Sequence, residues 1–229
     1  MSANTPAFVS YPNNPKLDYG RAATDVRHLA SFNASYDLPF GKGARFLNRP
    51  SGLVDRAAGG WSLSSIASLQ TGLPFSPQLG YNPTGSGDTR NPVRPNINPN
   101  FRGSVYTRGT TAERAAQFFN PNAFLAPAYG TVGNVGRDTL TGPGFADWDL
   151  SLLKSVKFTE SKRLQFRAEF FNILNHTNLL TPNEVVYSSG PTQGTNANQT
   201  AAAVESPTAG VVTAAATSRQ IQLGLKFLF

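Results

Sequence analysis

Apolar and polar residues alternate with a period of two in five stretches of the chain. Successive side chains of a strand point to opposite faces of its sheet, so this period predicts strands with one apolar and one polar face. The five stretches cover residues 27–38, 61–75, 147–158, 163–174 and 218–229. We therefore expect an all-β fold built from antiparallel strands.

The predicted strands are longer than the roughly 5–6 residues of a usual soluble strand. About 9–11 tilted residues suffice for a strand to cross a bilayer, so each stretch is long enough to do so. Five charged residues fall on the polar sides of the third and fourth stretches, namely Asp147, Asp149, Arg163, Arg167 and Glu169. We expect them to line the wet lumen of a transmembrane β-barrel. A soluble sheet with one wet face has the same alternation and is the alternative.

Lys154 departs from the alternation, because it falls on the apolar side near the middle of the third stretch. A lysine that faces lipid there would cost roughly 2–4 kcal/mol, so we expect a β-bulge near Leu152 and Leu153 that turns it inward. The third and fourth stretches keep their apolar sides together only if the turn around residues 159–162 has an odd number of residues, three or five.

The connections between the stretches differ in length. The turn at residues 159–162 and the segment 40–60 are shorter, whereas residues 76–146 and 175–217 form long connections. Outer-membrane barrels have short periplasmic turns and longer extracellular loops, so we expect the long connections and residues 1–26 to lie outside the cell. Residues 195–217 are rich in small residues, which is typical of a mobile loop tip, and ligand capture is the functional alternative.

The two tryptophans, Trp61 and Trp148, each open a predicted strand, one at the periplasmic end and one at the outer end. Both fit the aromatic girdles that flank the apolar band of a membrane barrel. Packing against loop residues is the alternative.

Composition agrees with a β-rich chain. The 229 residues include 16 Phe and 7 Tyr, which favour strands, and 21 Gly and 17 Pro, which favour turns and loops, whereas only 14% are charged. The net charge is +7, but Lys and Arg are scattered along the sequence, so we expect no nucleic-acid partner. The chain has no cysteine, no apolar run long enough for a transmembrane helix and no signal-peptide pattern at its start. We therefore expect any export signal to lie elsewhere.

Candidate catalytic chemistry is sparse. His28 and His176 lie at separate strand ends without zinc-ligand spacing, and the glycine-rich residues 130–144 lack a phosphate-loop signature. Asp147 and Asp149 have a spacing open to glycoside chemistry, but no substrate cleft accompanies them. We expect no enzyme activity, no cofactor and no metal.

Six segments carry a resemblance to a known family: YDLPFGKGARF, GGWSLSSIASLQTGLPFSP, FFNPNAFLAP, GTVGNVGRDTLTGPGFADWDLSLLKSVKF, LQFRAEFFNILNHTN and the terminal LGLKFLF. In this order they resemble the C-terminal part of TonB-dependent receptors with an Oar-like β-barrel, in the carboxypeptidase-regulatory-like/TonB-dependent receptor family. The resemblance extends from about Tyr36 to Phe229. It implies that Leu225, Phe227 and Phe229 are the C-terminal signal read by the barrel assembly machinery.

The resemblance also implies energised import of a large, scarce nutrient across the bacterial outer membrane. In such receptors a plug domain and a TonB box couple a barrel of about 22 strands to the inner membrane. We expect residues 1–229 to supply the last five strands, in contact with outer-membrane lipid, the rest of the receptor and, through it, TonB. Neither plug nor box is expected within this chain. An exported β-rich surface binding or adhesion protein without transport activity is the alternative.

Overall fold

The structure is a computed structural model of the chain, and it describes residues 9–11, 13–49, 51–87, 93–191 and 202–229. Its helices and strands are, in chain order, η1 (Pro15–Asp18), β1 (Leu29–Asp37), α1 (Gly52–Ala58), β2 (Trp61–Gln70), β3 (Pro74–Phe75), β4 (Gln78–Leu79), β5 (Asn96–Ile97), α2 (Thr111–Ala116), η2 (Pro121–Ala123), β6 (Phe124–Leu125), β7 (Leu140–Thr141), β8 (Phe145–Lys157), β9 (Arg163–Phe171), β10 (Val185–Ser189), β11 (Val204–Glu205) and β12 (Gln220–Leu228).

The chain divides into two compact units. The strand unit consists of His28–Gln70, Phe145–Asn178 and Thr217–Phe229. The loop unit consists of Met1–Arg27, Thr71–Gly144 and Leu179–Ala216. Each unit thus combines segments that are far apart in the sequence.

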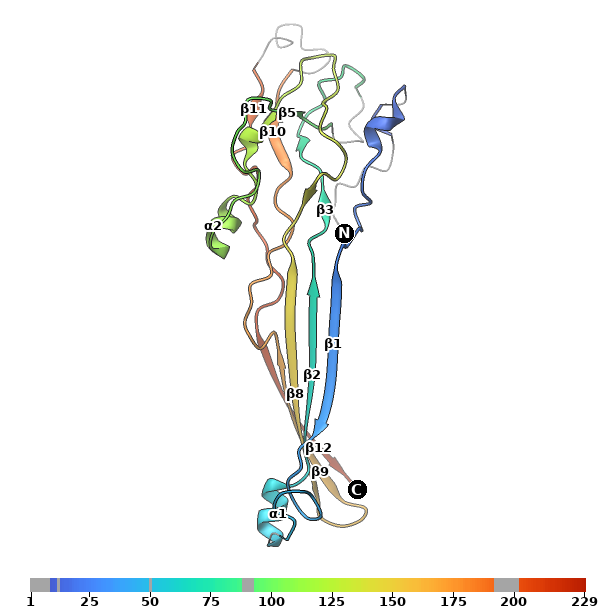
Figure 1. Cartoon of the computed structure of the whole chain (residues 1–229), viewed down its shortest axis with the longest axis vertical. Helices are drawn as coiled ribbons and strands as arrows, with labels where there is room; N and C mark the ends of the chain where they lie inside the picture. The colour runs from blue at the N-terminus through green and yellow to red at the C-terminus, as the bar shows by residue number, and fades with distance from the viewer. Residues whose placement is uncertain (1–8, 12, 50, 88–92, 192–201) are drawn as a thin grey trace. The chain divides into compact units, whose positions relative to one another are not determined.

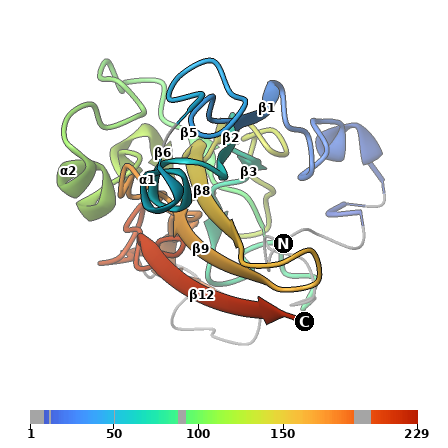
Figure 2. The ribbon, with the colours of Figure 1, turned by 90° about the horizontal axis from the view of Figure 1, so that it is seen from below.

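The strand unit is built on one five-stranded sheet in the order β1-β2-β8-β9-β12. Every pair of neighbouring strands in it is antiparallel, as the alternation predicts. The long strands lie side by side in Figure 1, and Figure 2 shows β8, β9 and β12 following an arc. A twisted and curved sheet of this kind is the local geometry that a barrel wall requires.

The strand boundaries differ from the predicted ranges where loop contacts take over. The strand predicted at 61–75 ends at Gln70, so its range is wrong at this end. Gly72 lies against the backbone of Gly142 too closely for any side chain, and Phe75 instead pairs with Leu140 in the loop unit. The strand predicted at 163–174 ends at Phe171, because Asn172 takes a positive φ of 50° that turns the chain.

The turn between β8 and β9 fits the predicted odd length. Lys157 pairs with Arg163, which leaves residues 158–162 as a five-residue turn. The predicted bulge near Leu152 and Leu153 is wrong, because the register of β8 continues without a shift against both β2 and β9. Lys154 therefore stays on the apolar side of the sheet.

The loop unit has a hydrophobic core of its own, although the sequence predicts its segments only as connections between strands. Phe75, Phe119 and Val186 are fully buried at its centre, and Phe75 and Phe124 both pack against Phe119 with ring centroids 5.8 and 6.0 Å away. Short strands hold the core together, including the three-stranded sheet β11-β10-β4. Loops that share a packed core form a folded unit.

The small-residue segment 195–217 contributes to this core. Residues 195–201 lie outside the described residues, so the predicted mobile tip is not assessed there. Beyond them, Ala209 and Val212 are buried, and the Val212 amide donates to the Ala115 carbonyl at 2.8 Å. The part that follows β11 therefore packs in places against the core of the loop unit, since its small side chains allow close approach, and its mobility stays a prediction.

Candidate membrane-spanning surface

The register of the five-stranded sheet sorts its side chains onto two chemically different faces. Leu63 of β2 pairs with Leu152 of β8, Leu152 pairs with Ala168 of β9, and Ala168 pairs with Leu223 of β12. Cross-strand partners share a face, so one apolar row crosses the sheet from strand to strand. Rows of the same kind recur at every second residue, as the period of two predicts.

The apolar face consists of Ala30, Phe32, Ala34 and Tyr36 in β1; Trp61, Leu63, Ser65, Ala67 and Leu69 in β2; Ala146, Trp148, Leu150, Leu152, Lys154 and Val156 in β8; Leu164, Phe166, Ala168 and Phe170 in β9; and Ile221, Leu223, Leu225 and Phe227 in β12. Several of its large side chains are exposed, with Phe32 and Leu223 each 66% accessible. The exposed large side chains lie on β1, β2, β8 and β12, whereas the residues that β9 contributes to this face are half-buried or buried. Exposed apolar side chains spread over four strands of one sheet mark a membrane or protein contact.

The opposite face is mainly polar, with Ile66 and Leu153 as apolar exceptions away from its ends. All five charged residues predicted to line a lumen lie on it, because Asp147, Asp149, Arg163, Arg167 and Glu169 share one parity in the register. Arg167 and Glu169 form a long ion pair of 3.6 Å between Nη1 and Oε1. The Asp149 Oδ1 accepts a hydrogen bond of 2.9 Å from the backbone amide of Asn172. Their exposure to a lumen stays a prediction.

The two tryptophans lie on the apolar face near opposite ends of the strands. The Trp148 Nε1 donates to the Ser65 hydroxyl at 2.7 Å, and the Trp61 Nε1 donates to the Ala57 carbonyl at 2.9 Å. Each indole thus presents an apolar ring while its N–H has a partner, which suits a membrane-water interface. Their place in aromatic girdles stays a prediction.

Lys154 is the charged exception on the apolar face, and its ammonium is satisfied without a bulge. It lies at the end of β8 near the turn, opposite Trp61, and only 8% of its surface is accessible. Its Nζ donates to the Ala57 carbonyl at 3.0 Å and to the Gly59 carbonyl, and it lies 5.1 Å from the Trp61 ring centroid. These carbonyls end α1, where a cation interacts favourably with the helix dipole.

The C-terminal aromatic residues are strongly exposed. Phe227 stacks on Phe229 with ring centroids 6.1 Å apart, and Phe229 is 92% accessible. Leu225 is exposed on the same strand, β12, opposite Phe166. These three side chains are open to contact, as an assembly signal requires, and that role stays a prediction.

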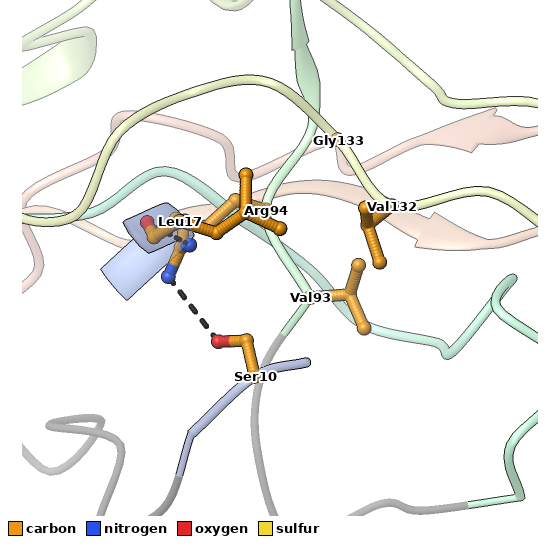
Figure 3. A pocket seen from close by; sticks show the side chains of 6 residues that line it. All are labelled: Ser10, Leu17, Val93, Arg94, Val132 and Gly133. Carbon is orange, nitrogen blue, oxygen red and sulfur yellow. Dashed lines mark hydrogen bonds between the residues drawn. The ribbon is translucent and has the colours of Figure 1, made fainter. Parts of the chain in front are cut away.

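A small hollow in the loop unit is closed by Arg94, which the sequence analysis did not single out. Figure 3 shows Arg94 beside Ser10 and Leu17, and its guanidinium donates to Asp18 Oδ1 at 2.9 Å and to the Leu17 carbonyl at 2.7 Å. The remaining cavity of about 10 Å³ is barely enough for one water. The cluster therefore fastens the N-terminal segment and leaves no room for a ligand.

The Asp18 carboxylate in this cluster is held in its charged form. Burial alone raises the pKa of Asp18, but hydrogen bonds from the Ser10 hydroxyl and amide and from Arg94 outweigh that effect, so its pKa lies below 3.8. The sequence indicates this site only by placing a charged residue, Arg94, directly after Val93 and before Pro95. Its partner Asp18 lies too far away in sequence to be inferred.

The glycine-rich residues 130–144 have a structural role. Gly133 passes so close to the backbone carbonyls of Arg94 and Pro95 that a side chain would not fit. Asp138 takes a positive φ of 51°, and its Oδ1 and amide both bond the Ser76 hydroxyl, at 3.0 and 2.8 Å. The segment thus has close backbone contacts and a turn that shape the loop unit.

Of the two histidines, His176 lies at the end of the strand unit, with its Nδ1 3.0 Å from Asn178 Oδ1. Within the described ranges, no group of three His, Asp or Glu side chains is placed to hold a metal ion. No helix in the described part of the chain is long and apolar enough to cross a membrane.

A curved antiparallel sheet with one exposed apolar face and one charged face defines a membrane-spanning β-sheet of the barrel type. A family model described as an outer membrane beta barrel domain matches residues 1–222. The chain belongs to this family, and its location is the bacterial outer membrane. Searches of curated proteins and of solved structures found no match.

Proposed function

We propose that this chain is the barrel portion of a TonB-dependent receptor that imports a large, scarce nutrient. The observation that carries the proposal is the combination of an exposed apolar face with two outer strands, β1 and β12, that pair on one side only among the described residues. Unpaired backbone groups at a strand edge are too costly in a bilayer. Further strands must therefore close the barrel around the charged face.

The charged face supports a lumen that admits water or a plug. Arg163, Arg167 and Glu169 of β9 and the two aspartates of β8 would be poorly tolerated in a dry core. Large receptors of this class enclose a plugged lumen, and their selectivity depends on the plug and the outer loops. The proposal includes no catalytic step by this chain.

The exposed C-terminal residues support assembly by the barrel assembly machinery. In the proposal, this machinery recognises Leu225, Phe227 and Phe229 and pairs β12 with its final neighbour. Deletion of Phe229 is expected to lower the folded, heat-modifiable fraction in the outer membrane several-fold. An equal change in Ile97→Ser, a substitution at an exposed apolar site of the loop unit outside the signal, would contradict a specific role.

The packed loop unit favours a second candidate, an exported surface binding or adhesion protein without transport activity. A loop unit with its own hydrophobic core can present a rigid binding surface. The genomic sequence upstream of Met1 separates the two candidates. An open reading frame with further alternating strands supports the receptor, and a stop codon followed by a signal peptide supports the surface protein.

Transport itself is tested by growth of the source bacterium on a panel of limiting iron chelates, oligosaccharides and peptides. Deletion of the gene is expected to abolish growth on one nutrient, and deletion of TonB is expected to abolish growth on the same nutrient. Normal growth of the gene deletion on every nutrient, with loss of surface attachment, would instead support adhesion.

A further inference from the structure

The segment that joins β1 to β2 combines exposed apolar side chains with a basic charge. We call its described residues, 38–49 and 51–60, the rim segment. Phe40, Phe46, Leu47, Leu53 and Val54 are exposed in it, and Leu53 of α1 is 79% accessible. Four basic residues and one acidic residue give the stretch 38–60 a charge of +3.

Positive charge collects at this end of the strand unit. The β8–β9 turn lies at the same end as α1 (Figure 1), and its residues 157–163 carry three basic side chains and one acidic one. The two stretches therefore account for +5 of the net charge of +7. A basic cluster of this size is attracted to anionic membrane surfaces. Lys and Arg are scattered in the sequence, and the fold brings the basic residues of these two stretches to the same end of the strand unit.

The rim segment is fastened on the apolar side of the sheet. Lys154 and Trp61, which both lie on the apolar face, bind the Ala57 carbonyl at the end of α1. The Arg56 guanidinium also lies 5.9 Å from the centroid of the Phe158 ring in the β8–β9 turn. The end of α1 is thus held at the edge of the surface that meets lipid in this family.

The geometry points to a lipid contact: we infer that the rim segment lies in the headgroup region of the inner leaflet and binds anionic phospholipids there. The short β8–β9 turn identifies this end as periplasmic, because short turns of membrane barrels lie on that side. Exposed Leu53 and Val54 would enter the acyl boundary, while Lys42, Arg45 and Arg49 would face phosphate groups. The inference depends on the outer-membrane location and not on transport.

Charge-neutralised variants test this inference in the protein purified from outer membranes in neutral detergent. Phosphatidylglycerol and phosphatidylcholine are titrated separately, and native mass spectrometry gives the two dissociation constants. The triple variant Lys42→Gln/Arg45→Gln/Arg49→Gln is expected to weaken phosphatidylglycerol binding at least about fivefold, the factor for one basic residue near an anionic surface. The control is Lys16→Gln/Arg102→Gln/Arg108→Gln, which removes three exposed basic residues from the loop unit and should bind like the parent.

The inference is overturned if the parent binds both lipids equally or if the control variant loses as much affinity as the rim variant. A photo-crosslinking amino acid at Leu53, activated in intact cells, supplies a second test that needs no loss of charge. Phospholipid adducts at Leu53 and few at the exposed Ala116 of α2 in the loop unit are the expected result. Adducts of Leu53 with a periplasmic protein alone would contradict a lipid contact.

Discussion

Placing an arginine on each face at the middle of β8 in turn tests whether the apolar face meets lipid and the polar face meets a lumen. Leu150 lies on the apolar face and Ser151 on the polar face, and Ser151 is the middle residue of Phe145–Lys157. At about 3.3 Å per residue and a tilt of about 45°, this strand spans about 30 Å, so both positions lie close to the bilayer midplane. Depth is therefore matched, and only the face differs.

Leu150→Arg is expected to lower the free energy of unfolding by about 2–4 kcal/mol, the cost of an arginine on the lipid face at the midplane. This corresponds to a roughly 30- to 700-fold change in the folding equilibrium. Ser151→Arg lies opposite Glu169 of β9, so its charge has a partner and its effect should stay within about 0.5 kcal/mol.

Urea unfolding in lipid vesicles measures the two changes, with heat-modifiable migration on gels as the check that each variant folds. The parent and both variants are compared in the same lipid. Equal destabilisation by the two substitutions, or a larger loss for Ser151→Arg, would refute the assignment of the faces.

Three further changes address individual contacts. Lys154→Met should speed amide exchange in α1, because two carbonyls lose a charged donor worth about 1.5–3 kcal/mol, whereas exchange in the rest of β8 stays as in the parent. The pKa of Asp18 lies below 3.8 in the folded protein, so the contact of its carboxylate with Ser10 stabilises the N-terminal segment above pH 3.8. This stabilisation is lost as the pH falls through the pKa of Asp18 in the folded protein. Amide exchange of the N-terminal segment, corrected for its intrinsic rate, should therefore speed up at low pH in the parent and not in Asp18→Asn. Asp138→Asn should be nearly neutral in thermal unfolding, since Asn tolerates a positive φ, whereas Asp138→Val should lower the melting temperature by several degrees, and equal effects would contradict a backbone role.

The sequence predicts the five-stranded sheet well because a bilayer imposes the period of two on every spanning strand. The same period predicts that the β8–β9 turn has an odd number of residues, and the register confirms five. The period did not predict the environment of Lys154, because the carbonyl groups that its ammonium binds lie far away in the sequence, at the end of α1. Ala57, for example, is separated from Lys154 by 97 residues. A local pattern contains no information on such a distant contact, which is why the predicted β-bulge near Leu152 and Leu153 was wrong.

The loop unit was beyond prediction for a related reason. Its core joins Phe75, Phe119 and Val186 from three distant segments that have no regular hydrophobic period. Phe75 even continues the alternation of β2, although it is buried in the loop unit and pairs with Leu140. The rim segment was missed because its basic residues come together only when α1 is fastened beside the β8–β9 turn.

Surface labelling in intact cells tests most directly whether this sheet spans the outer membrane, with the long connection 76–146 exposed outside the cell and the β8–β9 turn in the periplasm. The 229 residues contain no cysteine, so single cysteines at Ala116 in α2 and at Ser161 in the turn can be compared. A membrane-impermeant maleimide is expected to label Ala116→Cys in intact cells and Ser161→Cys only after the outer membrane is permeabilised. Labelling of both residues in intact cells, or of Ser161→Cys alone, would contradict the account.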